Sequence, residues 1–443
     1  MSVVNAIPLI AAGDDGYNLT RSLRFRSSAS AYLNRTPATA SNRKTFTWSG
    51  WVKRGTLSTY QHLFSATTGG YPFIVRFDTD NTIFVYQDGT SDYGGSTSAV
   101  YRDPSAWYHI VLAMDTTQAT DTNRLKLYVN GVQNSVSAFY GYFALNVDTS
   151  INSTGVHAIG QSGSANYFDG YMAEVNFIDG QALTPSSFGS FSSYNQWLPK
   201  KYAGTYGTNG FYLPFTNNAS AATLGNDFSG NGNTWTTNNI SVTAGATYDS
   251  MTDVPTLTSA TAANYCVLNP LSTTTALTDG NLKIASVSGT IITTQLVTSD
   301  KWYWELTLDG GSSYNYFFGV QSPNQVDYVY MGMCNGGNSP NIFAVGKSTN
   351  GTATQPTGSR PTQPATIGVK LDITAGSVEF LVNGTVNGSV TGITNWPTGQ
   401  YWMPFFSNWT ATFGYVPLTA NFGQQPFVNS LPTGFLALNT FNL

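Results

Sequence analysis

The sequence predicts an all-β protein built from two antiparallel β-sandwiches, and a repeated pattern carries this prediction. LKLYVNG from Leu125 and VEFLVNG from Val378 both alternate apolar and polar residues and end in Asn-Gly. Such alternation indicates a half-buried strand, and Asn-Gly is the strongest short-range indication of a β-hairpin. Each segment follows an apolar run that ends in aspartate, IVLAMD from Ile110 and IGVKLD from Ile367. One hairpin pattern that occurs twice indicates two domains of related design.

Composition supports the same fold class. The 443 residues exceed one ordinary domain, and 41% of them are hydrophobic, which is enough for a sizeable core. The 44 glycines and the 14% aromatic share are typical of turn-rich β proteins. Only 9% of residues are charged, against roughly a quarter in typical globular proteins. A surface of amides and hydroxyls can hydrogen-bond neutral ligands such as sugars, but it is also typical of a robust extracellular exterior.

Turn-forming residues divide the chain into an N-terminal arm (1–20), a first sandwich (21–203), an ordered polar connector (204–264) and a second sandwich (265–443). Turns recur about every ten residues, as expected for sandwiches. The main strands expected in the first sandwich are Ser22–Ser27, Phe46–Arg54, Phe73–Asp78, Thr82–Gly89, Trp107–Asp115, Leu125–Gly131, His157–Gln161 and Phe168–Asp179. Those in the second include Lys301–Asp309, Tyr316–Ser322, Val378–Gly384, Trp402–Trp409 and Leu418–Gly423.

Charge and cysteine content exclude some function classes. The net charge of −4 disfavours a general nucleic-acid binder. Nine of the nineteen basic residues lie between Gly16 and Phe77, where no acidic residue occurs. This basic region could dock on an acidic partner or could be a solvated positive face. Cys266 and Cys334 are too few for a disulfide scaffold, and we expect two buried thiols, although their pairing stays open. No apolar run approaches the ~20 residues of a membrane span.

Several runs of sequence resemble known families. FTWSGWVKRG, the WYHIVLAMD and LKLYVNG pair, and YFDGYMAEVNFIDGQALTPSSFG together resemble the laminin-G-like branch of the concanavalin-A-like sandwiches, whose topology is of the jelly-roll type. The last of these runs is similar to versions found in tail and head proteins of tailed phages. KWYWELTL, GVKLDITAGSVEFLVNG and NFGQQPFVNSLPTGFLAL resemble a SPRY domain, an interaction sandwich of the same superfamily.

The resemblance implies a phage virion surface protein, such as a tail fibre, spike or head decoration subunit. Its lectin-like domains would bind a host-surface polysaccharide during adsorption. It would contact other virion proteins, form a homo-oligomer, assemble in the host cytoplasm and leave by lysis, with no nucleic-acid binding and no membrane insertion. A purely architectural decoration or adaptor role is the alternative. The basic residues expected to dock on the virion are Arg21, Arg24, Arg26, Arg35, Arg43 and Lys44.

Some concanavalin-A-like sandwiches are glycoside hydrolases, so a polysaccharide depolymerase is a further alternative. Such enzymes need two carboxyl groups about 5–5.5 Å or about 6.5–9.5 Å apart. The chain has three glutamates, Glu174, Glu305 and Glu379, and none lies in a Glu-x-Asp-x-x-Glu strand. Because Glu305 and Glu379 alternate with core residues, we expect them to face solvent or a partner. The sequence therefore predicts no catalytic residue and a protein that is not an enzyme.

Loop aromatics and aspartates are the candidate binding residues. Aromatic faces stack on sugar rings, and Tyr and Trp also dominate protein interfaces, so the same residues could instead be buried or contact a neighbour. The candidate ligand-binding residues are Tyr93, Tyr140, Tyr142, Tyr167, Tyr314, Tyr328, Tyr330, Trp396 and Trp409. The resemblance also implies a calcium ion held by loop oxygens, for which Asp78, Asp80 and Asp115 are candidates. Aspartates at these positions are equally consistent with turn formation.

Overall fold

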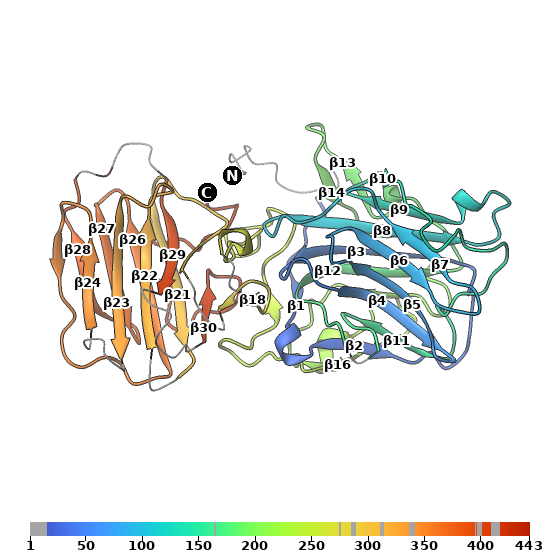
Figure 1. Ribbon diagram of the computed structural model, residues 1–443, viewed down its shortest axis with the longest axis horizontal. Coiled ribbons are helices and arrows are strands. Elements are labelled where there is room, and N and C mark those ends of the chain that lie inside the picture. Colours follow the sequence, from blue (N-terminus) through green and yellow to red (C-terminus); the bar gives the residue numbers. More distant parts are fainter. Residues whose placement is uncertain are drawn as a thin grey trace. The chain divides into compact units, whose positions relative to one another are not determined.

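The computed structural model describes residues 16–163, 165–273, 276–284, 289–310, 314–335, 342–394, 396, 401–408 and 417–443. The chain forms two compact units. The N-terminal unit runs through Val242 and includes Tyr248–Thr258, and the C-terminal unit comprises Thr243–Thr247 and Ser259–Leu443 (Figure 1). All paired strands are antiparallel in both units, which confirms the predicted all-β class. Within the described residues no helix is long or apolar enough to cross a membrane.

The N-terminal unit is a sandwich of two sheets. The first sheet has the order β10-β9-β8-β3-β12-β1-β17, and β15 also pairs with β12. Its strands are β10 Val132–Asn134, β9 Leu125–Val129, β8 Trp107–Asp115, β3 Thr45–Arg54, β12 Gly170–Asp179, β1 Ser22–Phe25, β17 Ser250–Met251 and β15 Phe211–Leu213. The second sheet, in spatial order, consists of β16 Thr236–Asn238, β2 Tyr32–Arg35, β11 Val156–Ile159, β4 Gln61–Thr68, β5 Tyr71–Phe77, β6 Ile83–Gln87 and β7 Tyr93–Ser96.

Short elements complete this unit and begin the next one. A small hairpin joins β13 Gly189–Phe191 to β14 Trp197–Pro199. The helical elements are single 3-10 turns, namely η1 Ser27–Ala29, η2 Asp121–Asn123, η3 Pro185–Ser187, η4 Ala222–Gly225 and, in the C-terminal unit, η5 Pro270–Ser272.

The core of the N-terminal unit lies between its two sheets. Phe46 and Trp48 alternate along β3 and point into one apolar cluster with Phe64 and Phe73 of the second sheet, and all four are fully buried. The other face of the first sheet is also covered, because Phe188 and further residues of the segment after β12 pack on it in a second apolar cluster. Burial on both faces explains why β8 and β12 are rich in apolar residues along their whole length.

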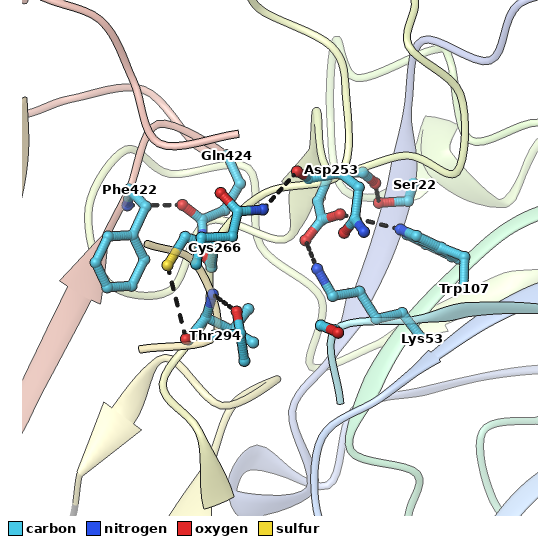
Figure 2. A network of polar contacts seen from close by, with 12 residues as sticks. Ser22, Lys53, Trp107, Asp253, Cys266, Thr294, Phe422 and Gln424 are labelled. Atoms are coloured by element: carbon cyan, nitrogen blue, oxygen red, sulfur yellow. Dashed lines mark hydrogen bonds and ion pairs between the residues drawn. The ribbon is translucent and has the colours of Figure 1, made fainter. Parts of the chain in front are cut away.

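Most of the expected connector belongs to the N-terminal unit. Its strands β15, β16 and β17 extend the two sheets, and buried ion pairs hold its last part in place. The Lys53 ammonium lies 2.7 Å from a carboxylate oxygen of Asp253, and both side chains are completely buried. Trp107 donates its indole N–H to the other oxygen of that carboxylate at 3.1 Å (Figure 2). The Arg24 and Arg26 side chains meet the buried Asp249 carboxylate at 3.1 and 2.8 Å.

Both Asn-Gly hairpins are present. Asn130 and Gly131 join β9 to β10 with φ angles of +49° and +79°. Asn383 and Gly384 join β27 (Ser377–Val382) to β28 (Thr385–Thr391) with φ angles of +47° and +84°. Positive φ at both central residues is the requirement of a type I′ turn, which Asn-Gly satisfies at little cost. The repeated hairpin of the sequence is therefore confirmed in both units.

The C-terminal unit also contains two antiparallel sheets. The first, in spatial order, consists of β18 Leu277–Thr278, β19 Lys283–Ile284, β30 Leu418–Asn421, β21 Lys301–Leu308, β26 Ala365–Asp372, β27 Ser377–Val382, β28 Thr385–Thr391 and β25 Thr352–Thr354. The second consists of β20 Gly289–Ile292, β29 Met403–Asn408, β22 Tyr314–Gln321, β23 Tyr328–Asn335 and β24 Ile342–Lys347.

The last part of the chain is tied to the C-terminal unit by buried polar contacts. Glu305 is buried and does not face solvent, contrary to expectation, because its carboxylate accepts the backbone N–H groups of Val428 at 2.7 Å and Asn429 at 2.8 Å. Gln424 donates its amide to the carbonyl of Cys266 at 3.3 Å (Figure 2). Cys266 is a buried thiol, as expected, whereas the side chain of Cys334 lies outside the described side chains.

Glu174 forms a buried polar site in the N-terminal unit. It lies in β12 with a φ angle of +52°, where the register with β3 shifts between Ala173 and Asn176. Tyr17 donates its hydroxyl to one carboxylate oxygen at 2.6 Å, and Tyr212 donates to the other at 2.9 Å. Burial raises the pKa of Glu174 to about 7. Tyr17 belongs to the expected arm, and its bond to Glu174 attaches residues 16–20 to the sandwich.

We predict that Asp253→Ala destabilises the N-terminal unit by about 3–5 kcal/mol, because it leaves the Lys53 ammonium buried without its partner. The double variant Lys53→Met/Asp253→Leu should recover most of that loss. Asp148→Ala is the control and should cost less than about 1 kcal/mol, because Asp148 and Arg43 are 3.9 Å apart and partly exposed. Urea denaturation measures the difference, and equal midpoints for Asp253→Ala and Asp148→Ala would contradict the prediction.

We also predict that the contribution of Glu174 to the stability of the N-terminal unit falls as pH rises from about 4.5 to about 7, because the folded protein binds the Glu174 proton more tightly than the unfolded chain does. The expected change in this contribution is about 2–3 kcal/mol, since one pKa unit corresponds to ~1.4 kcal/mol. Burial lowers the pKa values of His62, His109 and His157, so these residues make the total stability rise with pH in the same range. The test is therefore the difference in unfolding free energy between the unchanged protein and Glu174→Gln, measured by urea denaturation at stepped pH. This difference should shrink by about 2–3 kcal/mol from about pH 4.5 to about pH 7, and a constant difference would refute the assignment.

Candidate ligand-binding site

A hollow lies at one edge of the N-terminal sandwich, and its lining comes from β7, η2, β9, β10 and the segment after β10. Figure 1 shows β7, β9 and β10 at this edge. Its volume is about 240 Å³, near the lower limit of the roughly 300–1,000 Å³ typical of ligand pockets. The hollow is therefore suited to one or two sugar rings. Its lining combines amides, hydroxyls, one carboxylate and aromatic rings, and consists of Gly94, Asp121, Thr122, Leu125, Gln133, Asn134, Ser135, Val136, Ser137, Ala138, Gly141, Tyr142 and Phe143.

The segment after β10 forms much of the hollow because it crosses from the first sheet to the second. It leaves β10 and pairs with the end of β7 through a bridge between Thr97 and Val136. The N–H of Tyr140 then donates to the Gly94 carbonyl at 3.0 Å, and the N–H of Gly94 donates to the Gly141 carbonyl at 3.0 Å. These bonds hold residues 136–143 against the edge of the second sheet.

Glycine in β7 makes this close approach possible. A Cβ atom on Gly95 would lie 1.3 Å from the carbonyl oxygen of Ser137, which no side chain tolerates. Gly94 has a φ angle of +126°, a conformation that side-chain-bearing residues rarely adopt. The Gly-Gly pair is therefore a local requirement of the loop that carries the site.

Arg124 holds the opposite side of the hollow. Its guanidinium donates to three backbone carbonyls, those of Gln118 at 2.8 Å, Ala119 at 3.0 Å and Phe143 at 2.7 Å. These bonds join the β8–β9 connection, which contains η2, to the end of the 136–143 segment. The side chain is 91% buried, so its charge stabilises the loops from within.

Exposed aromatic rings flank the hollow. Phe139, Tyr140 and Tyr142 are 77%, 44% and 48% exposed, which is unusual for rings so close together in sequence. The Tyr140 ring centroid lies 4.9 Å from that of Phe139 and 5.0 Å from that of Tyr86. We call Tyr86, Phe139, Tyr140 and Tyr142 the aromatic ridge. Burial and a hydrogen bond to Asp92 raise the pKa of Tyr86 to about 12.

Polar groups of the hollow are partly pre-arranged. Tyr101 donates its hydroxyl to the side-chain oxygen of Asn134 at 2.7 Å, and the Asn134 amide donates to the Val132 carbonyl at 3.1 Å. Asp121 accepts the backbone N–H of Thr122 at 2.7 Å through one carboxylate oxygen. These contacts fix the orientation of an amide and a carboxylate that line the hollow.

The structure brings together three of the predicted ligand residues. Tyr140 and Tyr142 belong to the aromatic ridge, and Tyr93 stacks on the pocket residue Phe143 with centroids 5.6 Å apart. Tyr167 does not join them, because it pairs with Tyr32 at 6.0 Å. Sequence reasoning did not select Phe139, Gln133 or Asn134. The run SAFYGYF, in which aromatics alternate with small residues directly after a hairpin, is the feature that could have indicated them.

The predicted residues of the C-terminal unit form no described pocket lining. Tyr328 and Tyr330 lie side by side on β23, with centroids 5.8 Å apart. Trp396 packs against the buried Trp402 at 4.6 Å. The side chain of Tyr314 and all of Trp409 lie outside the described residues.

The three predicted calcium ligands each make contacts within their own loops. Asp78 pairs with Arg76 at 2.9 Å. A hydrogen bond from the Thr82 hydroxyl lowers the pKa of Asp80. Burial opposes ionisation of Asp115, but hydrogen bonds from Thr117 and Gln118 lower its pKa overall. Among the described residues no three His, Cys, Asp or Glu side chains group to hold a metal, and a calcium ion held partly by backbone carbonyls stays a prediction.

Two of the six residues of the predicted basic docking face are buried. Arg24 and Arg26 are buried against Asp249 and are therefore not available to a partner. The other members are partly exposed but mostly engaged within the unit. Arg21 donates to the Ser250 carbonyl, Arg35 to the side chains of Asn209 and Asn233, and Arg43 to the Thr149 carbonyl, while Lys44 is half-buried.

We predict that Gly95→Ala displaces residues 136–143, because the added methyl group collides with the Ser137 carbonyl. Hydrogen exchange of this segment should rise at least about tenfold, while the β3 and β12 amides keep their protection. Gly89→Ala is the matched control, since its added carbon would come no closer than 3.2 Å to a neighbour. Unchanged exchange of residues 136–143 in Gly95→Ala would show that the glycine is dispensable.

The chain was compared with curated protein sequences and with solved structures. No curated protein sequence matches the chain. Among the similar solved structures, domains LG4-5 of the mouse laminin α1 chain are 10% identical, with 98% of this chain and 98% of that chain covered and a TM-score of 0.31. A putative carbohydrate binding protein from Bacteroides ovatus is 17% identical, with 50% of this chain and 59% of that chain covered and a TM-score of 0.32. Domain 4 of a GH43 extracellular arabinanase from Geobacillus stearothermophilus, in complex with arabinotriose, is 17% identical, with 40% of this chain and 82% of that chain covered and a TM-score of 0.29. Such low identities and TM-scores carry no argument about ligands.

The family comparison is more specific because it rests on sequence. Residues 27–187 match the model of the concanavalin A-like lectin/glucanases superfamily in its laminin G form. The match runs from η1 to η3, so it includes most strands of both sheets and the loops around the hollow, whereas β1, β15, β16 and β17 lie outside it. The N-terminal unit therefore contains a laminin-G-like domain of the concanavalin A-like lectin/glucanases superfamily.

Proposed function

We propose that the protein is a lectin-like protein that binds a surface glycan of a host cell through the hollow and its aromatic ridge. The observation that carries this proposal is the combination of a sugar-sized hollow lined by hydroxyls and amides with exposed Tyr and Phe rings at its rim. Carbohydrate rings have apolar faces that stack on aromatics and hydroxyls that hydrogen-bond to amides and carboxylates. The family description, which includes lectins, supports the same class of ligand.

We propose further that this binding is not coupled to catalysis. Each of the three glutamates is engaged in a structural contact. Glu174 accepts the hydroxyls of Tyr17 and Tyr212, Glu305 accepts backbone N–H groups, and Glu379 pairs with Lys370. The hollow itself is lined by one carboxylate, Asp121. A hydrolytic pair of carboxyl groups would need a second one within about 10 Å.

A phage virion is the setting that we propose for this binding. The similarity of YFDGYMAEVNFIDGQALTPSSFG to runs in head and tail proteins of tailed phages supports it. In this setting the protein lies on the virion surface, contacts other virion proteins, forms a homo-oligomer and is released by lysis. The second sandwich, with its SPRY-like runs, serves as an interaction module. Labelling of purified particles with an antibody against this protein tests the location.

A purely architectural role is the second candidate, and one surface feature favours it. The hairpin β13–β14 exposes Phe191 and Tyr194, which are 42% and 75% exposed. Trp197 of the same hairpin packs on Gly131, next to the 59% exposed Val132. Exposed apolar groups gathered in this way are typical of protein contacts. A virion map in which neighbouring subunits cover both this hairpin and the hollow would select this role over adsorption.

We predict that Tyr142→Ala weakens binding of the glycan at least about tenfold, because it removes an exposed ring that lines the hollow. Tyr140→Ala removes the neighbouring exposed ring of the aromatic ridge and should weaken binding in the same direction. Their melting temperatures should stay close to that of the unchanged protein, since both side chains are exposed. Phe228→Ala is the matched control, because Phe228 is 49% exposed and lies beside β15, far across the first sheet from β10.

Binding is measured first on a glycan array and on host cells, and then by calorimetry with the selected oligosaccharide. Full binding by Tyr142→Ala would show that the hollow is not the site. Absence of binding to any glycan or to host envelopes would overturn the proposed function as a whole.

A further inference from the structure

We infer that the hollow selects uncharged sugars and rejects acidic ones, such as uronates and sialic acids. This inference rests on the proposed glycan-binding function and deepens it by naming the class of sugar. It follows from the charges that surround the hollow and from the way each nearby cation is used.

The lining of the hollow has a negative charge and no positive one. Asp121 is exposed and is the charged residue among those that line it. None of the lining residues is Lys, Arg or His. A sugar carboxylate in the hollow would meet the Asp121 carboxylate without a cation to offset the repulsion. A sugar hydroxyl, in contrast, can donate to Asp121 and accept from the amide of Gln133.

The nearest basic side chains are directed elsewhere. Arg124 is 91% buried, and its guanidinium is occupied by the carbonyls of Gln118, Ala119 and Phe143. Lys126 follows Leu125 in β9, and neighbouring residues of a strand point to opposite faces. Leu125 packs toward the core between the sheets, whereas Lys126 lies opposite Ala113, which belongs to the outer apolar cluster of the first sheet.

Charges of both signs lie next to the aromatic ridge. The hydroxyl of Tyr86 is hydrogen-bonded to the Asp92 carboxylate. The Arg76 guanidinium lies 4.6 Å from the ring centroid of Phe84, which packs on Tyr86. The ridge therefore does not by itself repel an anion, and the repulsion of an anionic sugar rests on Asp121 in the hollow.

Matched pairs of oligosaccharides test this inference on the full chain. Galactose and galacturonate trisaccharides, and glucose- and glucuronate-terminated trisaccharides, differ within each pair in the carboxylate. We expect the neutral member of a bound pair to bind at least about tenfold more tightly than the acidic member near physiological salt. Binding of the neutral member should change less than about twofold between about 0.05 and 0.5 M NaCl, because no ion pair forms.

Asp121→Lys should raise affinity for the acidic member, relative to the neutral member of the same pair, at least about fivefold, and Asp121→Asn should shift this ratio in the same direction by a smaller factor. Asp121 is exposed, so both variants should fold, and their melting temperatures check this. Tighter binding of an acidic member by the unchanged protein, lost in Tyr142→Ala, would overturn the selectivity and leave the glycan-binding function standing. Binding of neither member of any pair would overturn the proposed function and the selectivity with it.

Discussion

The N-terminal unit depends on charges that lie wholly inside it. Lys53 meets Asp253, and Arg24 and Arg26 meet Asp249, with these side chains almost entirely removed from water. Taking an ion out of water costs several kcal/mol unless a partner of opposite charge accompanies it. The basic partners come from β1, the residue after it and β3, and the acidic ones come from a segment 200 to 225 residues later in the chain. Buried ion pairs of Asp249 and Asp253, which flank β17, therefore hold this strand in the sheet together with apolar burial.

This closure explains why the candidate site lies at the opposite edge. β17 and β15 complete the first sheet on one side, and β16 completes the second. On the other side the sheets end in β10 and β7, which are short. The segment 136–143 spans these two edges and pairs with β7 instead of a further strand. Edge strands carry backbone groups that need covering, and here the covering segment also supplies the exposed rings.

Features encoded by neighbouring residues were predictable, and those made by distant residues were not. Asn130–Gly131 and Asn383–Gly384 specify their turns locally, and the apolar residues of β8 and β12 specify buried strands. Tyr140 and Tyr142 could be selected because an aromatic loop follows a hairpin. The burial of Arg24 and Glu305 could not be foreseen, since Asp249 and Asn429 lie far away in sequence. The alternation of apolar and polar residues in β21 correctly placed Glu305 on the face opposite the core, but it did not reveal that the segment around Asn429 covers that face.

Arg124 has a consequence for the conditions under which the loops keep their shape. In many loop-rich sites a bound divalent ion gathers carbonyl oxygens from separate segments. Here a guanidinium attached to the chain itself gathers three of them, from both sides of the hollow. Its positive charge persists at every physiological pH, since arginine does not lose its proton there. The loops around the hollow should thus stay assembled in chelator-treated or calcium-poor surroundings, where ion-braced loops come apart.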